Sequence, residues 1–361
     1  MLKNRFLFLP VLMFLLVFLI DKLMLLEKVQ TYFSKTLSEA NYLHKPILFQ
    51  ELQEYLQKKD RKKVLVYFGN SRGLLFNNKY IAEHYPDWLL FNFSVPGGTP
   101  DYSYFWLEQF QEKDVRPDFI LLDNSVESYN LDAKIKIDEV LVNGLTLAFV
   151  LRHYSRYTKE DVSNLIAKRM FPSYQYRPNP KTALKRMKND FEILHGFRYW
   201  RERVRIRLQE ERGSAAAELS QNPVSSEENI KAIADGDFKS YMSPFRFNHN
   251  MLFFLENSIS TVKEMKIPLA IIWVKVAPYY LHLMKTKKVP PKAGSPERLV
   301  VYEKWSKELS ELYKKIQVSF WNMNEDPKYQ CNQFADASHM ATSCYPDYTD
   351  YIFQHMGVAK K

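Results

Sequence analysis

Three residues in two distant parts of the sequence have the types and spacing that acyl transfer needs. Ser71 follows a short apolar run, and Asp336 and His339 stand three residues apart near the end of the chain. Acyl transfer uses a nucleophile, a base that takes its proton and a carboxylate that orients the base. We therefore predict that Ser71 is the nucleophile, His339 the base and Asp336 the orienting carboxylate.

The same reaction also needs hydrogen-bond donors for the oxyanion that forms on the substrate. The N–H of Ser71, at the start of a predicted helix, is one candidate donor. Gly98 allows the backbone to approach closely and is a second candidate, and the side-chain amide of Asn124 is a third. Arg72 and Gly97 are predicted to contact the substrate. We expect no metal and no cofactor.

Each of these signals has a simpler structural explanation when it is taken alone. A serine after a strand usually caps a helix, and a Gly-Gly pair usually forms a turn. An Asp-x-x-His pattern also occurs by chance. The order of the residues, together with their placement after strands, is what favours a catalytic site.

The elements that would bring these residues together are short apolar strands. The predicted strands are Val64–Phe68, Trp88–Phe93, Phe119–Leu122, Leu269–Val274 and Val318–Trp321. Short apolar strands that alternate with helices indicate a parallel sheet covered on both faces, and such sheets bind ligands at the carboxyl ends of their strands. We therefore predict an α/β fold, a three-layer α/β/α sandwich with a mostly parallel five-stranded sheet.

Three helices are predicted around the sheet from their spacing of apolar residues. They cover residues 28–60, Tyr102–Glu112 with Asp101 as N-cap, and Pro296–Lys315, which is amphipathic. These helices supply the covering layers that a parallel sheet requires.

The first 28 residues are predicted to form a transmembrane signal anchor. Phe6–Ile20 contains no charged residue, and Lys22 can snorkel so that the apolar segment is long enough to span a bilayer. A cleaved signal peptide and a buried helix stay open as alternatives, although no small-x-small cleavage site follows. Lys3 and Arg5 precede the run, which favours a cytoplasmic N-terminus and a periplasmic or extracytoplasmic main domain in a single-pass inner-membrane protein.

A basic helical insertion, residues 130–248, is predicted between the third and fourth strands. The segment 152–212 contains 16 Lys and Arg against 7 Asp and Glu, nearly all of the net charge of +10. A solvated helix face, an anionic membrane surface, and an acidic glycan or partner remain open, and nucleic acid is not expected outside the cytoplasm. Residues 213–237 have the composition of a mobile linker. The α/β domain would then consist of 29–129 and 249–361.

The two cysteines of the chain, Cys331 and Cys344, flank Asp336 and His339. In an oxidising compartment they could form a disulfide that holds the histidine loop. Two buried thiols and a metal site that includes His339 are the alternatives.

The order Ser, Gly, Asn and Asp-x-x-His resembles the SGNH (GDSL-like) hydrolase superfamily. Its four blocks would be Ser71, Gly97 or Gly98, Asn124, and Asp336 with His339, within residues 64–130 and 265–345. The first block has Gly-Asn-Ser in place of Gly-Asp-Ser, and the third lacks Gly-x-Asn-Asp. The chain looks closest to a membrane-anchored bacterial SGNH-like family of unknown function. It is also similar to extracytoplasmic proteins that acetylate alginate or pass D-alanine to lipoteichoic acid.

The resemblance implies a membrane-anchored serine esterase or O-acyltransferase outside the cytoplasm. The expected reaction is O-acetyl transfer to a cell-envelope polysaccharide or lipid, with a membrane-bound O-acyltransferase as partner. The alternative is a catalytically inactive envelope protein that binds glycan or docks such an acyltransferase. Reaction of Ser71 with a serine-directed phosphonate would distinguish the two.

Overall fold

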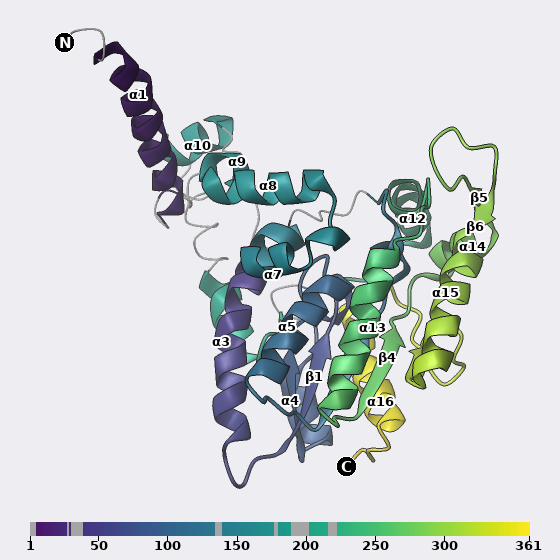
Figure 1. The fold of residues 1–361 in the computed structure, drawn as a ribbon. Coiled ribbons are helices and arrows are strands. Elements are labelled where there is room, and N and C mark those ends of the chain that lie inside the picture. The colour runs from purple at the N-terminus through teal and green to yellow at the C-terminus, as the bar shows by residue number, and fades with distance from the viewer. Residues whose placement is uncertain are drawn as a thin grey trace.

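A parallel five-stranded sheet forms the centre of the protein, with the strand order β2-β1-β3-β4-β7 (Figure 1). The computed structural model describes residues 5–26, 29, 39–133, 139–176, 180–188, 202–215 and 222–361. The strands are β1 (Lys63–Phe68), β2 (Trp88–Asn92), β3 (Phe119–Asp123), β4 (Leu269–Trp273) and β7 (Ser319–Asn322). The predicted α/β class and all five predicted strands are confirmed, with ends that differ by one residue.

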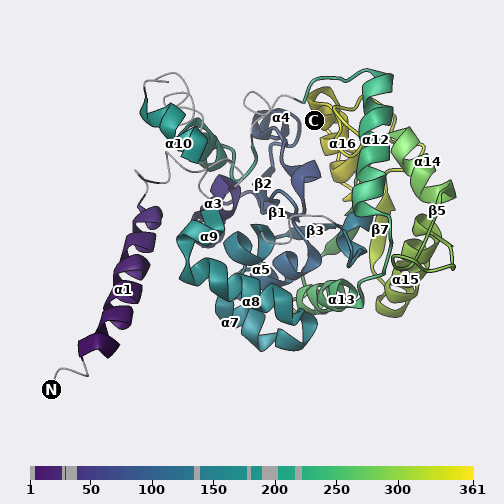
Figure 2. The same cartoon turned by 90° about the horizontal axis from the view of Figure 1, so that it is seen from above.

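Helices cover both faces of this sheet, as a parallel sheet requires (Figures 1 and 2). One layer contains α3 (Glu39–Leu56), α5 (Pro100–Glu112), α13 (His249–Glu264) and α15 (Val301–Ile316), and the other contains α4 (Asn78–His84) and α16 (Tyr345–His355). In the first layer Phe49 of α3 packs against Trp106 of α5, and Lys315 of α15 pairs with Glu256 of α13. The three-layer sandwich is therefore as predicted.

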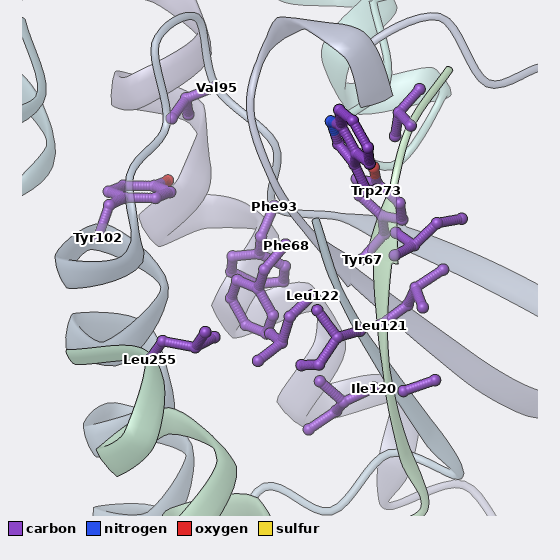
Figure 3. Packing of buried hydrophobic residues seen from close by; sticks show 14 of the residues in the cluster. Tyr67, Phe68, Phe93, Val95, Tyr102, Ile120, Leu121, Leu122, Leu255 and Trp273 are labelled. Carbon is purple, nitrogen blue, oxygen red and sulfur yellow. The ribbon is translucent and has the colours of Figure 1, made fainter. Parts of the chain in front are cut away.

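Aromatic and aliphatic side chains fill the space between the sheet and the first helix layer (Figure 3). The ring centroids of Phe68 and Phe93 lie 5.2 Å apart, and both rings contact Phe110 of α5. Figure 3 shows Leu255 of α13 and Tyr102 of α5 approaching the same cluster. This packing fixes the carboxyl ends of β1 and β3, where the candidate site residues follow.

Two predicted helix starts are wrong. Helix α5 begins at Pro100 with Thr99 as its N-cap, and Asp101 is buried in the first turn, where it accepts a hydrogen bond from Tyr157. Helix α15 begins at Val301 rather than at Pro296. Its start is later because β6 (Leu299–Val300) pairs antiparallel with β5 (Lys288–Val289), and this pairing extends the backbone just before the helix.

The first predicted helix is shorter than expected. Within the predicted span 28–60, α3 covers Glu39–Leu56, and residues 57–60 form a turn that leads into β1. Residues 27–28 and 30–38 lie outside the described part of the chain.

The insertion is helical in the parts that the structure describes. Its helices include η5 (Val140–Gly144), α7 (Leu147–Arg152), α8 (Lys159–Met170), α9 (Pro172–Tyr176), α10 (Pro180–Met187) and α12 (Glu227–Tyr241). Phe149, Leu165 and Phe238 from these helices belong to the same hydrophobic cluster as the sheet. The insertion therefore packs on the α/β core and shares its apolar interior.

The linker prediction for 213–237 is wrong for residues 227–237, which form most of α12. The side chain of Ser226 accepts a hydrogen bond from the N–H of Asn229 and caps this helix. Just before it, the N–H of Ser225 donates to the carbonyl oxygen of Phe334 at 2.9 Å. Residues 216–221 lie outside the described part of the chain.

Helix α1 (Arg5–Lys22) extends away from the α/β core (Figure 1). The segment Phe8–Leu25 is long and apolar enough to cross a membrane, and only 6% of it is buried in the protein. In the rest of the described chain no other helix meets this test. Such an exposed apolar helix is suited to a bilayer rather than to water.

Candidate active site

Ser71 is the first residue of a short turn of 3₁₀ helix, η3 (Ser71–Gly73), directly after β1. Asn70 caps this turn: its side-chain oxygen accepts a hydrogen bond from the N–H of Arg72 at 2.9 Å. Its side-chain amide donates to the hydroxyl of Ser125 at 3.0 Å, and Ser125 follows β3. In this way the neighbouring strand end braces the Ser71 turn.

Ser71, His339 and Asp336 form a continuous chain of hydrogen bonds. The Oγ of Ser71 lies 2.7 Å from Nε2 of His339, and Nδ1 of His339 lies 2.8 Å from Oδ2 of Asp336. These distances allow a proton to pass from the hydroxyl to the imidazole while the carboxylate holds the ring. The structure therefore brings Ser71 to a pair of residues that lie more than 260 positions away in the sequence.

Asp336 is ionised at neutral pH. Burial alone would raise the pKa of this carboxyl, but hydrogen bonding and charge from His339 lower it to about 2, together with the N–H groups of Ser338 and His339. Both N–H groups donate to Oδ1 of Asp336 at 2.8 Å. A carboxylate that stays charged can stabilise the imidazolium formed during acyl transfer.

Several links hold the loop that carries Asp336 and His339. Cys331 and Cys344 form a disulfide with a Cα–Cα distance of 5.6 Å. The bond confirms the first of the three alternatives for these cysteines and leaves neither sulfur as a thiol or a metal ligand. The N–H of Ala277 donates to the carbonyl of Ala337 at 2.9 Å, so the loop is also fixed to the segment after β4.

Arg72 connects the Ser71 turn to this loop. Its Nε donates to the carbonyl oxygen of Ser338 at 2.9 Å, and its Nη2 lies 2.5 Å from Oε1 of Glu127. Only 5% of Arg72 and 7% of Glu127 is exposed, so this is a buried ion pair. The substrate-binding role predicted for Arg72 stays untested, and the buried bonds instead favour a positioning role.

The Gly97-Gly98 turn packs against the loop before the nucleophile. A Cβ atom at Gly98 would lie 2.2 Å from the carbonyl oxygen of Gly69, so only glycine fits at this position. Gly97 has φ of 69°, a left-handed conformation that also favours glycine. The N–H of Gly98 donates to the carbonyl of Val95 at 3.1 Å, so the predicted oxyanion donor already has a partner.

Asn124 follows β3 as predicted, but its amide points into the core. Only 2% of the residue is exposed, and its Nδ2 donates to the hydroxyl of Tyr313 on α15 at 2.5 Å. The oxyanion roles of Asn124 and Gly98 therefore remain predictions that require a change of partner. The N–H of Ser71 lies at the first position of its turn, where helical N–H groups have no partner within the helix.

Asp237 on α12 is an acidic residue near the site that the sequence analysis missed. Burial raises its pKa to about 6, and the nearby charges of Asp336 and Glu127 add to this effect, whereas His339 opposes it. It was missed because composition alone placed its segment, residues 213–237, in a linker. Among the described residues, no cluster of three or more His, Cys, Asp or Glu side chains could hold a metal.

Comparison with known proteins gives a family but no activity. No curated protein matches the chain. A family model described as "Protein of unknown function (DUF1574)" matches residues 1–356, which is nearly the whole sequence. The chain therefore belongs to the DUF1574 family.

Proposed function

We propose that this protein is a serine-dependent esterase or O-acyltransferase. The observation that carries the proposal is the unbroken series of hydrogen bonds from Ser71 through His339 to Asp336 at the carboxyl end of β1. Sheets with this strand order bind ligands where the order reverses, and here that point lies between β1 and β3. The similarity to SGNH hydrolases in the order of the four blocks supports the same reaction.

In the proposed reaction, Oγ of Ser71 attacks the acyl carbonyl carbon while its proton moves to Nε2 of His339. The carbonyl oxygen becomes an oxyanion, for which the N–H of Ser71 is a candidate donor. The tetrahedral intermediate collapses, and His339 returns the proton to the departing alcohol. A second hydroxyl, from water or from a sugar, then attacks the acyl-serine, and the same proton transfers in reverse order release the product.

The place of action that we propose is the outer side of the inner membrane. Helix α1 would anchor the chain with its N-terminus in the cytoplasm, and the disulfide between Cys331 and Cys344 is typical of oxidising compartments. The acceptor would then be a cell-envelope polysaccharide or lipid. A membrane-bound O-acyltransferase is the proposed partner, because the acyl group must be supplied from the other side of the membrane.

A second candidate function is binding without catalysis. It is favoured by the engaged N–H of Gly98 and the buried amide of Asn124, since both of these predicted oxyanion donors already have protein partners. In that case the domain would bind glycan or dock the acyltransferase.

Labelling with a fluorophosphonate tests the proposal directly. We expect the full chain in detergent to be labelled, and Ser71→Ala to abolish the labelling because an activated serine is required. Ser310→Ala is the control and should keep the labelling, since Ser310 is an exposed serine on α15 whose hydroxyl bonds within its own helix. Absence of labelling in folded protein, or labelling that persists in Ser71→Ala, would refute the catalytic proposal and leave the binding function.

Asp237→Asn is expected to change the pH dependence of ester hydrolysis. Above a pH of about 6 Asp237 is charged, and its charge interacts with that of His339. Removing this carboxylate takes its titration out of the site, so the acidic limb of kcat/KM should change within about one unit of pH 6. Asp235→Asn, an exposed position on the same helix, should leave the limb in place. An unchanged limb in Asp237→Asn would show that this carboxylate does not act on the base.

A further inference from the structure

We propose that α7, α8, α9 and α10 form a membrane-binding platform that lies on an anionic lipid bilayer next to α1. The platform is defined by the outward apolar side chains of residues 147–187. This proposal goes beyond the proposed function, because it assigns a lipid-binding surface and does not depend on catalysis.

Pairs of exposed apolar residues recur on three helices of the platform. The pairs are Leu147 and Leu151 on α7 (36% and 51% exposed), Ile166 and Met170 on α8 (38% and 46%), and Leu184 and Met187 on α10 (53% and 65%). Within each pair the spacing of three or four residues places both side chains on one helix face. Single exposed apolar residues are ordinary, but a repeated set of this kind marks an interaction surface.

The outward face of α8 is not needed to build the core. On its inner side Val162 and Leu165 are buried in the hydrophobic cluster. On its outer side Lys159, Ile166 and Met170 share an exposed face at intervals of seven and four residues. The helix therefore has one apolar surface for the protein and further apolar side chains that face outward.

Contacts with the end of α1 set the depth of this surface in the membrane. The ammonium group of Lys22 donates to the carbonyl of Met170, and the N–H of Ser173 donates to Asp21 at 3.0 Å. The rings of Phe18 and Phe171 pack edge to face with centroids 6.0 Å apart. Asp21 and Lys22 are the first charged residues after the apolar run Phe6–Ile20, so the residues that bond to them are expected to lie at the membrane surface.

The charge and aromatic content of the platform indicate what covers it. Lys159 is exposed on α8, and Lys181, Lys185 and Lys188 are exposed on or next to α10. Basic side chains beside an apolar face are typical of helices that lie in the plane of an anionic bilayer. Two tyrosines, Tyr154 and Tyr174, are 45% and 41% exposed in the same region and suit the headgroup layer.

The arrangement also directs the candidate site toward the bilayer. Figure 1 shows α8 and α9 beside the lower end of α1, with α7 and α8 on the side of the sheet where the strands end. Ser71 follows the carboxyl end of β1 and therefore lies on this side. A chain held by α1 alone could rotate about one tether, whereas the platform would fix which side of the domain faces the lipid.

Depth-dependent quenching in nanodiscs tests the platform in the full chain. Both native cysteines are in a disulfide, so Leu151→Cys and Met187→Cys can each be labelled selectively with a nitrobenzoxadiazole dye. Lys59→Cys is the matched control. Lys59 is exposed in the turn between α3 and β1, at the amino ends of the strands and away from the platform. With phosphatidylglycerol in the discs, we expect blue-shifted emission and at least twofold quenching by brominated lipid at the two platform positions, and neither effect at Lys59→Cys.

The source of the attraction is tested by lipid composition and by charge reversal. Quenching at Met187→Cys should fall in discs of phosphatidylcholine alone, and it should also fall when Lys181→Glu and Lys185→Glu are added in phosphatidylglycerol discs. Emission at Leu151→Cys and Met187→Cys that resembles the Lys59→Cys control would overturn the platform. Quenching that is equal in phosphatidylglycerol and phosphatidylcholine discs, and equal with and without the two lysine substitutions, would overturn the assignment to anionic lipid. Because these readouts do not use activity, they stay informative if Ser71 proves unreactive.

Discussion

Changing Ser71 or His339 to alanine is expected to lower kcat for p-nitrophenyl acetate by about 10⁴-fold or more. Each change removes one partner of the 2.7 Å hydrogen bond through which the proton must pass. Because the two residues act as one unit, the double variant should be no slower than the slower single variant. Steady-state hydrolysis by the full chain in detergent measures these rates.

Two further variants give this prediction its controls. Asp336→Asn should lower kcat less than His339→Ala does, because the imidazole remains but is no longer held by a charged partner. Ser338→Ala should be nearly neutral, since its hydroxyl lies at 3.2 Å from Nδ1 of His339, an atom already engaged by Asp336. Hydrolysis that survives unchanged in His339→Ala would contradict the proposed general base.

Glu127→Leu is expected to destabilise the fold by about 3–5 kcal/mol. The substitution removes the carboxylate that pairs with the guanidinium of Arg72 at 2.5 Å and leaves a buried cation without this partner. Burial alone would lower the pKa of Arg72, but the charges of Glu127 and Asp123 hold it above its ordinary value, so the cation persists at every working pH. Urea unfolding of the full chain would measure the decrease in the free energy of unfolding.

A double substitution separates the structural effect of this pair from its effect on the site. Arg72→Met combined with Glu127→Leu removes both charges, and apolar replacements of a buried ion pair are often neutral in stability. Stability should therefore recover, but turnover should stay low because the bond from Arg72 to the carbonyl of Ser338 is lost. Full recovery of turnover in the double variant would show that Arg72 does not position the histidine loop.

The strands could be predicted because their signal is local. Each strand is a short apolar run, and in β1 five consecutive residues are buried, which leaves a continuous run in the sequence. Once the sheet was predicted, the positions of Ser71, Asp336 and His339 after strands followed from the rule for carboxyl ends. The geometry of the three side chains agrees with that prediction.

The orientation of Asn124 could not be predicted, because a distant residue sets it. Its amide bonds to Tyr313, which is 189 positions away and reaches it only when α15 packs on the sheet. The start of α15 was likewise moved by a pairing between β5 and β6 that no local pattern indicates.

Helix α12 was missed although a signal was present. Serine and alanine content suggested a linker, but Ser226 precedes Glu227 and Glu228, a common helix start. Ile230, Ala234 and Phe238 then follow at four-residue intervals, and the last two are buried. Periodicity was the better guide than composition in this segment.

The disulfide that closes the histidine loop makes the stability of the site depend on the redox compartment of the chain. The bond between Cys331 and Cys344 spans the segment that holds Asp336 and His339, and closing a loop of this size contributes about 3 kcal/mol. In a reducing cytosol this contribution is missing, so a newly made chain would be least competent where it is synthesised. Oxidation after translocation would then serve as a maturation step without proteolysis. If the domain is exported as proposed, such a step would keep the site inactive toward cytosolic esters until the disulfide has formed.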